Sequence, residues 1–238
     1  MDRFVLFGVH HLAALGAVLL AAVVLVAIAR RTSGTSALAM RYVLAAALLL
    51  CTAVTLGYWW RRGFLSPLDL LPLHLCDFLI LVAVFALVTL ERTSCELLLF
   101  WAGTGTVLAM LGPDLQSGFP SWAFVSFFLL HGLVVVAAAV VTFGFGRRPR
   151  EGAPWRVFAL TNAYALVVGV VNLALDTNYL FLREKPHGRT LLDWFGPWPV
   201  YLFVAEVAAA GLFWLLDAPF RAARSASARP VARPATDR

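Results

Sequence analysis

Three side chains that could do chemistry lie close together in the apolar stretch of residues 66–90: His74, Cys76 and Asp77. Ionisable groups are costly at membrane depth, so they usually face a protein interior or a wet cavity and usually serve a function. A thiol beside a break in a helix could be a reactive centre, because the thiolate is the nucleophilic form of cysteine. A buried cysteine in a bent helix is the alternative, and this stretch alone leaves both open.

The residues before this group carry the signals of a helix start. Ser66 is expected to be the N-cap, with Asp69 three residues later as in a capping box. Pro72 lies inside the expected helix and has no N–H group, so it predicts a kink shortly before Cys76. We therefore expect one kinked helix over residues 67–90.

The composition excludes a soluble globular domain. Of the 238 residues, 61% are hydrophobic and 13% charged, and runs of about 20 apolar residues recur along the chain, as in polytopic helical membrane proteins. The basic residues lie between the apolar runs and at the end of the chain, which favours lipid headgroups over nucleic acid as their partners. We predict an all-α bundle of seven transmembrane helices that forms one domain over residues 1–217. The expected spans are roughly 4–29, 38–60, 67–90, 94–112, 121–146, 155–175 and 197–217.

The arginines and lysines predict how the chain is oriented. The first, third and fifth loops and the end of the chain hold 13 of the 19, and the N-terminus and the other loops hold 6. The positive-inside rule then places the N-terminus outside and the C-terminus in the cytoplasm. Residues 218–238, rich in Arg, Ala, Pro and Ser, are expected to form a disordered basic cytoplasmic tail. The first apolar run, from Phe4 to Ala29, has no convincing cleavage site and is expected to remain as a span.

In this topology most polar side chains of the spans fall at one depth. Cys76 and His131 each lie ten residues beyond the expected start of their helix, which is about 15 Å at ~1.5 Å per residue. The opposite halves of the spans hold almost no polar residues. We therefore predict a polar cavity in the outer half of the bundle. Its other expected members are His10, His11, His74, Asp77, Asp114, Asn172, Asp176, Asn178 and Glu206.

Cys76 and His131 could together carry out acyl transfer or hydrolysis. Such chemistry needs a nucleophile, a base that accepts its proton and a third group that orients the base. The third group could be Asp77, Asp114 or Glu206. The alternative is a cysteine that packs as a small apolar residue and a histidine hydrogen-bonded to a neighbouring helix.

Two other functions fit the same polar residues. Three of the histidines could hold zinc, as in membrane-embedded lipid amidases, but no H-x-x-x-H spacing occurs, and His10 and His11 point about 100° apart on a helix. Acids inside the spans could form a path for protons or cations, although the spans show no inverted halves. A non-enzymatic transporter or binding protein and a metal-dependent hydrolase stay open, while the cysteine mechanism calls for no metal and no cofactor.

Two further features have less specific interpretations. Arg183 and Lys185 lie in the long loop of residues 176–196 and could contact a lipid phosphate or simply be solvated. The run from Gly103 to Gly105 gives one helix a thin face, which favours close packing of a neighbouring helix.

With these residues in view, the chain resembles the YwaF-like bacterial integral membrane proteins, prokaryotic relatives of the transmembrane protein 164 family. The matching motifs occur in the expected order from about residue 4 to residue 220, and as a set they are specific. They are His11 in the first span, LPLHLC at Leu71–Cys76, Pro113-Asp114-Leu115, His131-Gly132, Asn178-Tyr179, Leu182-Arg183-Glu184-Lys185-Pro186, and Gly196-Pro197-Trp198-Pro199 leading to Glu206.

The resemblance implies a function in lipid chemistry. The eukaryotic branch is associated with phospholipid acyl transfer through a membrane-embedded cysteine, which implies Cys76 as the nucleophile and His131 as the base. Membrane phospholipids are then the expected partners, and a bacterial inner membrane is the expected location. The headgroup and acyl chain of the substrate stay undefined. The resemblance assigns no role to the other matching polar residues, which are His11, His74, Asp114, Asn178 and Glu206.

Overall fold

The computed structural model describes residues 3–186 and 191–227, and this part of the chain is helical. Seven helical segments are long and apolar enough to cross a membrane. This confirms the predicted fold class, an all-α polytopic membrane protein; the orientation of the bundle stays a prediction. The segments are Val9–Ala29, Gly34–Arg61, Leu68–Thr89, Arg92–Leu111, Trp122–Gly144, Ala153–Leu175 and Val200–Ala226.

Several of these segments are built from more than one element. Short 3-10 helices precede or connect some of the spans, one π-helical turn (Ala102–Thr106) interrupts the span Arg92–Leu111, and another (Val140–Gly144) ends the span Trp122–Gly144. The elements in order are α1 (Val9–Ala29), α2 (Gly34–Arg61), η1 (Leu68–Leu70), α3 (Leu75–Thr89), α4 (Arg92–Trp101), η2 (Ala102–Thr106), α5 (Val107–Leu111), α6 (Trp122–Ala139), η3 (Val140–Gly144), α7 (Ala153–Leu175), η4 (Tyr179–Phe181), η5 (Leu191–Phe195) and α8 (Val200–Ser227).

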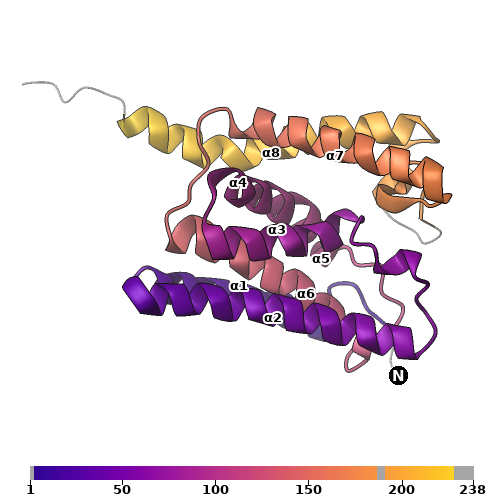
Figure 1. The fold of residues 1–238 in the computed structure, drawn as a ribbon, viewed down its shortest axis with the longest axis horizontal. Coiled ribbons are helices and arrows are strands. Elements are labelled where there is room, and N and C mark those ends of the chain that lie inside the picture. The colour runs from indigo at the N-terminus through magenta and orange to yellow at the C-terminus, as the bar shows by residue number, and fades with distance from the viewer. Residues whose placement is uncertain (1–2, 187–190, 228–238) are drawn as a thin grey trace, which may run out of the picture.

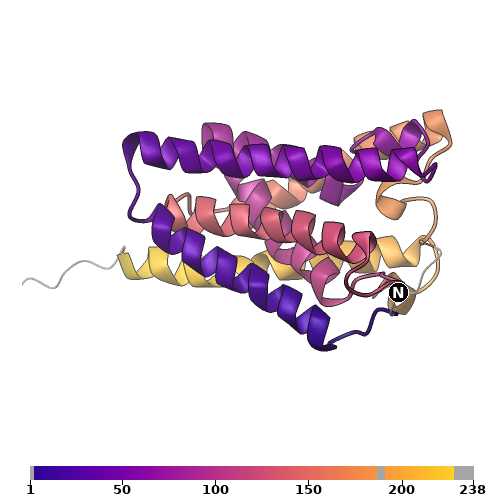
Figure 2. The same ribbon diagram turned by 90° about the horizontal axis from the view of Figure 1, so that it is seen from below.

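The helices lie roughly side by side, with α3 and α4 between the α1–α2 side and the α7–α8 side (Figure 1). Helix α6 packs against α1, α2 and α3, so it also belongs to the centre of the bundle (Figure 2). The α4–α5 and α6 spans are 61% and 56% buried, against 6–17% for α1, α2, α7 and α8. The outer helices therefore present their apolar side chains to lipid, and the inner ones form the core.

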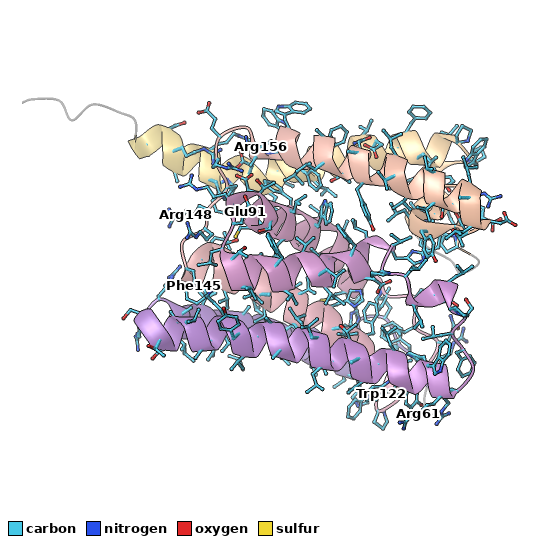
Figure 3. All side chains as sticks on the ribbon, viewed as in Figure 1. Arg61, Glu91, Trp122, Phe145, Arg148 and Arg156 are labelled. Carbon is cyan, nitrogen blue, oxygen red and sulfur yellow. The ribbon has the colours of Figure 1, made fainter. Side chains whose placement is uncertain are left out.

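The bundle has two ends that carry different residues. Glu91, Arg148 and Arg156 lie at one end, called the Arg156 end, and Arg61 and Trp122 lie at the other, called the Trp122 end (Figure 3). Because α3 and α6 both begin at the Trp122 end, residues early in these two helices share that side of the bundle.

The stretch around Pro72 is broken rather than kinked, which corrects the predicted helix over 67–90. The capping box is present, since the N–H and Oγ of Ser66 both donate to Oδ2 of Asp69 at 2.7 Å, but it closes only the 3-10 turn η1. Leu71, the residue before Pro72, is extended at φ −72° and ψ 121°, as expected where a proline ring excludes the helical region for its predecessor. A new helix, α3, then begins at Leu75.

Helix α8 extends ten residues past the predicted end at 217, so residues 218–227 are not the disordered tail that the composition indicated. Asp217 pairs with Arg221 and Arg224 across one and two turns, at 3.4 Å and 2.9 Å. Alanine and arginine favour helix, and these pairs add to that preference. The rest of the predicted tail, 228–238, lies outside the described residues.

Small residues let inner and outer helices approach each other closely. A methyl group added to Gly103 would come 2.7 Å from Cδ2 of Leu216, so α8 packs against the thin face that the sequence suggested. A methyl group on Gly144 would come 2.6 Å from Cβ of Ala29, which cannot rotate away. The contact at Gly144 thus fixes the spacing between η3 and the end of α1.

We expect Gly144→Ala to lower the free energy of unfolding by about 1–3 kcal/mol, the usual cost of overpacking. Gly16→Ala is the matched control, because nothing lies within 4 Å of its added methyl group and alanine favours helix. Thermal unfolding in detergent compares the two variants with the wild type. Equal midpoints for Gly144→Ala and Gly16→Ala would contradict the close approach.

Glu91 caps the N-terminus of α4 at the Arg156 end. Its carboxylate accepts hydrogen bonds from the N–H of Thr93 at 2.8 Å and of Ser94 at 2.7 Å. Slight burial acts to raise the pKa of Glu91, but these donors outweigh it and hold the pKa below its ordinary value. The charged carboxylate therefore stabilises the fold above the unfolded-state pKa, and this contribution is lost as the pH falls through the folded-state pKa.

Glu91→Ala is accordingly expected to cost about 1 kcal/mol near neutral pH, as loss of an N-cap usually does. The difference from the wild type should shrink at pH ~3, below the ordinary glutamate pKa of about 4.3. Thermal unfolding of Glu91→Ala and the wild type, near neutral pH and at pH ~3, measures the cost of the substitution and its change with pH. A penalty that stays constant with pH would mean that the charge does not contribute.

Candidate functional site

One small cavity brings together two of the residues that the sequence nominated for chemistry. Cys76 from α3 and His131 from α6 both line it, together with Asp77. Its volume is about 40 Å³, which is room for water but far below the ~300–1,000 Å³ of a typical ligand pocket. The remaining lining residues are Ile80, Thr106, Leu130 and Val134.

Cys76 is the second residue of α3, and its N–H lies in the first turn of that helix. The first intrahelical bond runs from the N–H of Phe78 to the carbonyl of His74 at 3.0 Å, and the N-cap His74 provides no side-chain cap. The N–H groups of Leu75, Cys76 and Asp77 therefore have no acceptor within the helix. Such a helix start carries partial positive charge and favours a thiolate or another oxygen or sulfur anion beside it.

The break before α3 also sets the depth of the thiol. With 15 residues, α3 is about 22 Å long at ~1.5 Å per residue, shorter than the ~30 Å of a hydrocarbon core. The membrane-length segment begins seven residues earlier, at Leu68, so the N-terminus of α3 falls inside that segment rather than at its end. Cys76 is half-buried at this position.

His131 is held in a state that can accept a proton. Its Nδ1 lies 2.9 Å from the carbonyl oxygen of Phe127, one turn earlier in α6, and its ring stacks on that of Phe127 at 4.1 Å. A carbonyl oxygen can only accept, so Nδ1 carries the hydrogen and Nε2 keeps a lone pair. No hydrogen-bond partner of Nε2 is found among the described residues.

Of the three acids considered as orienting groups, Asp77 lines the cavity and the other two lie elsewhere. Asp114 is exposed in the loop after α5 and accepts a hydrogen bond from Gln116 at 3.3 Å. Glu206 of α8 accepts from Nδ2 of Asn162 of α7 at 3.0 Å and so joins the two outer helices. Nδ1 of His131 is already bonded to a backbone carbonyl, which takes the orienting role that the sequence assigned to an acid.

His11 and His74 have structural contacts away from this cavity. His11 is buried: its Nδ1 accepts from the N–H of Phe7, and its Nε2 donates to the carbonyl of Met110, both at 2.9 Å. It thereby joins the start of α1 to the end of α5. The ring of His74 packs against those of Tyr179 and Phe181, each at 5.4 Å between centroids.

His10, the neighbour of His11, lies close to the ring of Phe119 at 5.3 Å and lines a separate hollow near the N-terminus. The histidines of the first span therefore do not face Cys76.

Asn172 and Asn178 hold the backbone of the loop after α7 through side-chain hydrogen bonds. Oδ1 of Asn172 accepts from the N–H of Tyr179 at 2.8 Å and from Oγ1 of Thr177 at 2.9 Å. Oδ1 of Asn178 accepts from the N–H of Arg183 at 3.0 Å, and its Nδ2 donates to the carbonyl of Glu184 at 2.9 Å. Both side chains replace backbone partners that this non-helical segment lacks.

The basic residues of this loop are engaged with acids of the same loop. Arg183 pairs with Asp176 at 2.6 Å, and Lys185 lies 3.9 Å from Asp193. The expected contact of Arg183 and Lys185 with a lipid phosphate stays a prediction. The polar groups that the sequence assigned to one layer are thus divided among several sites.

A comparison with models of protein families matches residues 6–217 to the TMEM164 family. The chain belongs to the TMEM164 family. The matched region covers the described chain from before α1 to Asp217 and includes the cavity with Cys76 and His131. No curated protein and no solved structure matches the chain.

Thr106 is a cavity residue of this TMEM164 family chain that the sequence did not single out. It is 2% exposed and closes the π-helical turn η2. Such turns shift the register of a helix and are frequent at functional sites. In the sequence, the run from Gly103 to Gly105 just before Thr106 was the only sign of an unusual helix here, and it indicated close packing rather than a cavity.

The histidines of this TMEM164 family chain do not assemble a metal site in the part that the structure describes. Among residues 3–186 and 191–227, no three His, Cys, Asp or Glu side chains form a group that could hold a metal ion. The three histidines have different neighbours: Phe7 and Met110 for His11, Tyr179 and Phe181 for His74, and Phe127 for His131.

Proposed function

We propose that this TMEM164 family membrane protein transfers or hydrolyses the acyl group of a membrane lipid, with Cys76 as nucleophile and His131 as base. The observation that carries the proposal is the shared cavity: a thiol at the uncapped start of α3 faces the same space as an imidazole whose Nε2 is free to accept a proton. A nucleophile beside an oriented base is the arrangement that acyl transfer requires.

The proposed reaction has two halves. Nε2 of His131 takes the proton of Cys76, and Sγ attacks the ester carbonyl carbon, forming a C–S bond and a tetrahedral oxyanion. The oxyanion collapses, the ester C–O bond breaks, and the leaving alcohol takes the proton from His131. An acceptor alcohol or water then loses its proton to His131 and attacks the thioester, and the thiolate is released and reprotonated by His131.

The start of α3 supplies a candidate for oxyanion stabilisation. The N–H groups of Cys76 and Asp77 have no acceptor within the helix, and they lie next to the attacking sulfur in the sequence. Hydrogen-bond donors aimed at the developing negative charge usually make the largest single contribution to such reactions. Because Pro72 ends the preceding turn, these donors are available inside the bilayer rather than at its surface.

The substrate in this proposal is a membrane phospholipid. Cys76 lies inside an apolar membrane-length segment, where the ester of a lipid can reach it and a water-soluble ester is excluded. Ile80, Leu130 and Val134 give the cavity apolar walls. The proposal also includes the finer assignments: a YwaF-like bacterial chain, located in the inner membrane, with its N-terminus and the Cys76 cavity on the outer side. The excess of basic residues in the loops at the other end supports that orientation.

Acyl transfer to protein tests the first half of the reaction. Purified protein in detergent is incubated with p-nitrophenyl octanoate, and its intact mass is followed over time. We expect one octanoyl group on Cys76 in the wild type and none in Cys76→Ala. His131→Gln should slow acylation by about 10²-fold or more, the usual contribution of a general base.

Cys51→Ala and Cys95→Ala are the matched controls, because both residues are free cysteines outside the cavity. They should acylate as the wild type does. Acylation that persists in Cys76→Ala, or that His131→Gln leaves at the wild-type rate, would refute the mechanism.

A further inference from the structure

A second and larger cavity lies at the Arg156 end, between the start of α7 and the last turns of α8. Its volume is about 430 Å³, and it is separate from the Cys76 cavity. The side chains that matter for its chemistry are Glu151, Trp155, Trp214, Asp217, Arg221 and Arg224. Nothing in the acyl-transfer proposal uses these residues.

One part of this cavity carries uncompensated positive charge. Arg221 and Arg224 both donate to the same oxygen, Oδ2 of Asp217, at 3.4 Å and 2.9 Å. Two guanidinium groups thus share one carboxylate, which leaves one net positive charge. Each guanidinium also donates from Nη1 to a backbone carbonyl, of Trp214 for Arg221 and of Pro149 for Arg224, both at 3.0 Å, and its remaining N–H groups have no hydrogen-bond partner among the described residues. Arginine forks of this kind suit the oxygens of a phosphate.

One oxygen of Asp217 lacks a hydrogen-bond donor in the described chain, which indicates that the cavity can accept a ligand. Asp217 is 1% exposed, lines the cavity, and its Oδ1 has no hydrogen-bond partner among the described residues. A buried polar atom without a partner is costly. A donor group that enters the cavity would satisfy it.

The other part of the cavity suits a cation. The carboxylate of Glu151 is exposed and has no hydrogen bond or ion pair within the described chain, although its backbone carbonyl accepts from Arg156. The rings of Trp155 and Trp214 meet edge to face at 6.2 Å, and Arg221 lies over Trp214 at 4.3 Å. Trp155 is 58% exposed, so its ring is accessible to another cation.

The position of the cavity indicates a lipid as the occupant. From Val200 to Asp217, α8 rises about 26 Å at ~1.5 Å per residue, which is close to the ~30 Å of a hydrocarbon core. Asp217, Arg221 and Arg224 therefore stand at the membrane boundary of the Arg156 end. Next to them Leu215 is 70% exposed on the lipid-facing side of α8, where an acyl chain could continue.

We infer that this cavity binds the headgroup of a zwitterionic phospholipid, with the phosphate on Arg221 and Arg224 and the ammonium between Glu151 and Trp155. The four formal charges of the lining sum to zero, as do those of the headgroup, and both are divided into a positive and a negative part. The bound lipid belongs to the leaflet at the Arg156 end, opposite the Cys76 cavity. It is therefore a second lipid rather than the molecule whose ester Cys76 would attack.

Native mass spectrometry of the full chain in detergent tests the inference with three probes. They are dioctanoyl phosphatidylethanolamine, dioctanoyl phosphatidylglycerol, which lacks the ammonium, and glycerophosphoethanolamine, which lacks the acyl chains. We expect one phosphatidylethanolamine to be retained per chain, with at least tenfold weaker retention of the other two. Glu151→Gln should remove the preference over phosphatidylglycerol, and Arg221→Gln should weaken both lipids about tenfold.

Arg148→Gln is the matched control, because Arg148 is an exposed arginine at the same end and outside the cavity (Figure 3). It should leave retention unchanged. Equal retention of the two lipids by the wild type, or an Arg148→Gln effect as large as that of Arg221→Gln, would overturn the site in favour of a diffuse surface charge. Retention of glycerophosphoethanolamine equal to that of the lipid would overturn the lipid assignment. These readouts do not depend on acyl transfer, so either proposal can fail alone.

Discussion

Replacement of Cys76 by serine is expected to reduce acyl turnover by about 10³-fold or more, as removal of a catalytic nucleophile usually does. Serine keeps the size of the side chain and its place in the first turn of α3, but its hydroxyl ionises far less readily than a thiol. The measurement is the exchange or release of a labelled acyl chain from phospholipid in proteoliposomes. Cys51→Ser and Cys95→Ala, which change free cysteines outside the cavity, should keep wild-type turnover.

A second variant distinguishes a catalytic pair from two independent contributors. His131→Gln should lower turnover, and the double variant Cys76→Ser/His131→Gln should be no slower than Cys76→Ser alone, because residues that act as a unit do not add. Thermal unfolding of each variant shows whether the fold is kept. Full turnover in a folded Cys76→Ser protein would end the covalent mechanism.

Glu96→Ala is expected to lower the free energy of unfolding by about 2–4 kcal/mol, because it removes the buried partner of two arginines. Glu96 is 2% exposed in α4 and accepts hydrogen bonds from Arg150 and Arg156, which come from the loop before α7 and from α7 itself. The closest contacts are 2.9 Å to Arg150 and 3.2 Å to Arg156. The loss falls below that of a fully buried pair because the two arginine side chains are 36% and 40% exposed.

Thermal unfolding in detergent measures this effect, with Glu91→Ala as the matched control. Glu91 lies five residues earlier at the same end of the bundle, but it caps only its own helix. Glu96→Ala should also loosen the contact between α4 and α7, so backbone amides early in α7 should exchange hydrogen faster. A Glu96→Ala protein as stable as Glu91→Ala would contradict the role of Glu96 as the link between these helices.

The seven spans could be predicted from the sequence because the bilayer sets the length of each apolar run. About 20 apolar residues are needed to cross it, and every run of that size became a membrane-length helical segment. The predicted helix boundaries were wrong at two places, where a neighbouring residue outweighed the signal used to predict them. The Ser66–Asp69 box formed as expected, yet Pro72 ended the helix, and paired charges carried α8 past residue 217.

The candidate site could be predicted only in part. Counting residues along a helix gives the depth of a side chain only where the helix is unbroken: the count held for His131 in α6, but Cys76 lies in the first turn of α3 rather than ten residues into a helix. The count does not give the direction in which a side chain points, since the rotation of each helix is set by the neighbours against which it packs. His11, Asn172 and Glu206 also belong to the half of the bundle at the Trp122 end, but they do not face the Cys76 cavity. Their hydrogen-bond partners are Met110 for His11, Tyr179 for Asn172 and Asn162 for Glu206.

The sequence by itself therefore determined the helical membrane fold and the residue types able to do acyl chemistry. Only the tertiary structure decided that Cys76 and His131 face one cavity, that Thr106 joins them from a π-helical turn, and that Phe127 fixes the tautomer of the base. The physical reason is that hydrophobic length is a property of each segment alone. The meeting of side chains depends on how several segments pack, through contacts such as Gly103 against Leu216 that no single segment encodes.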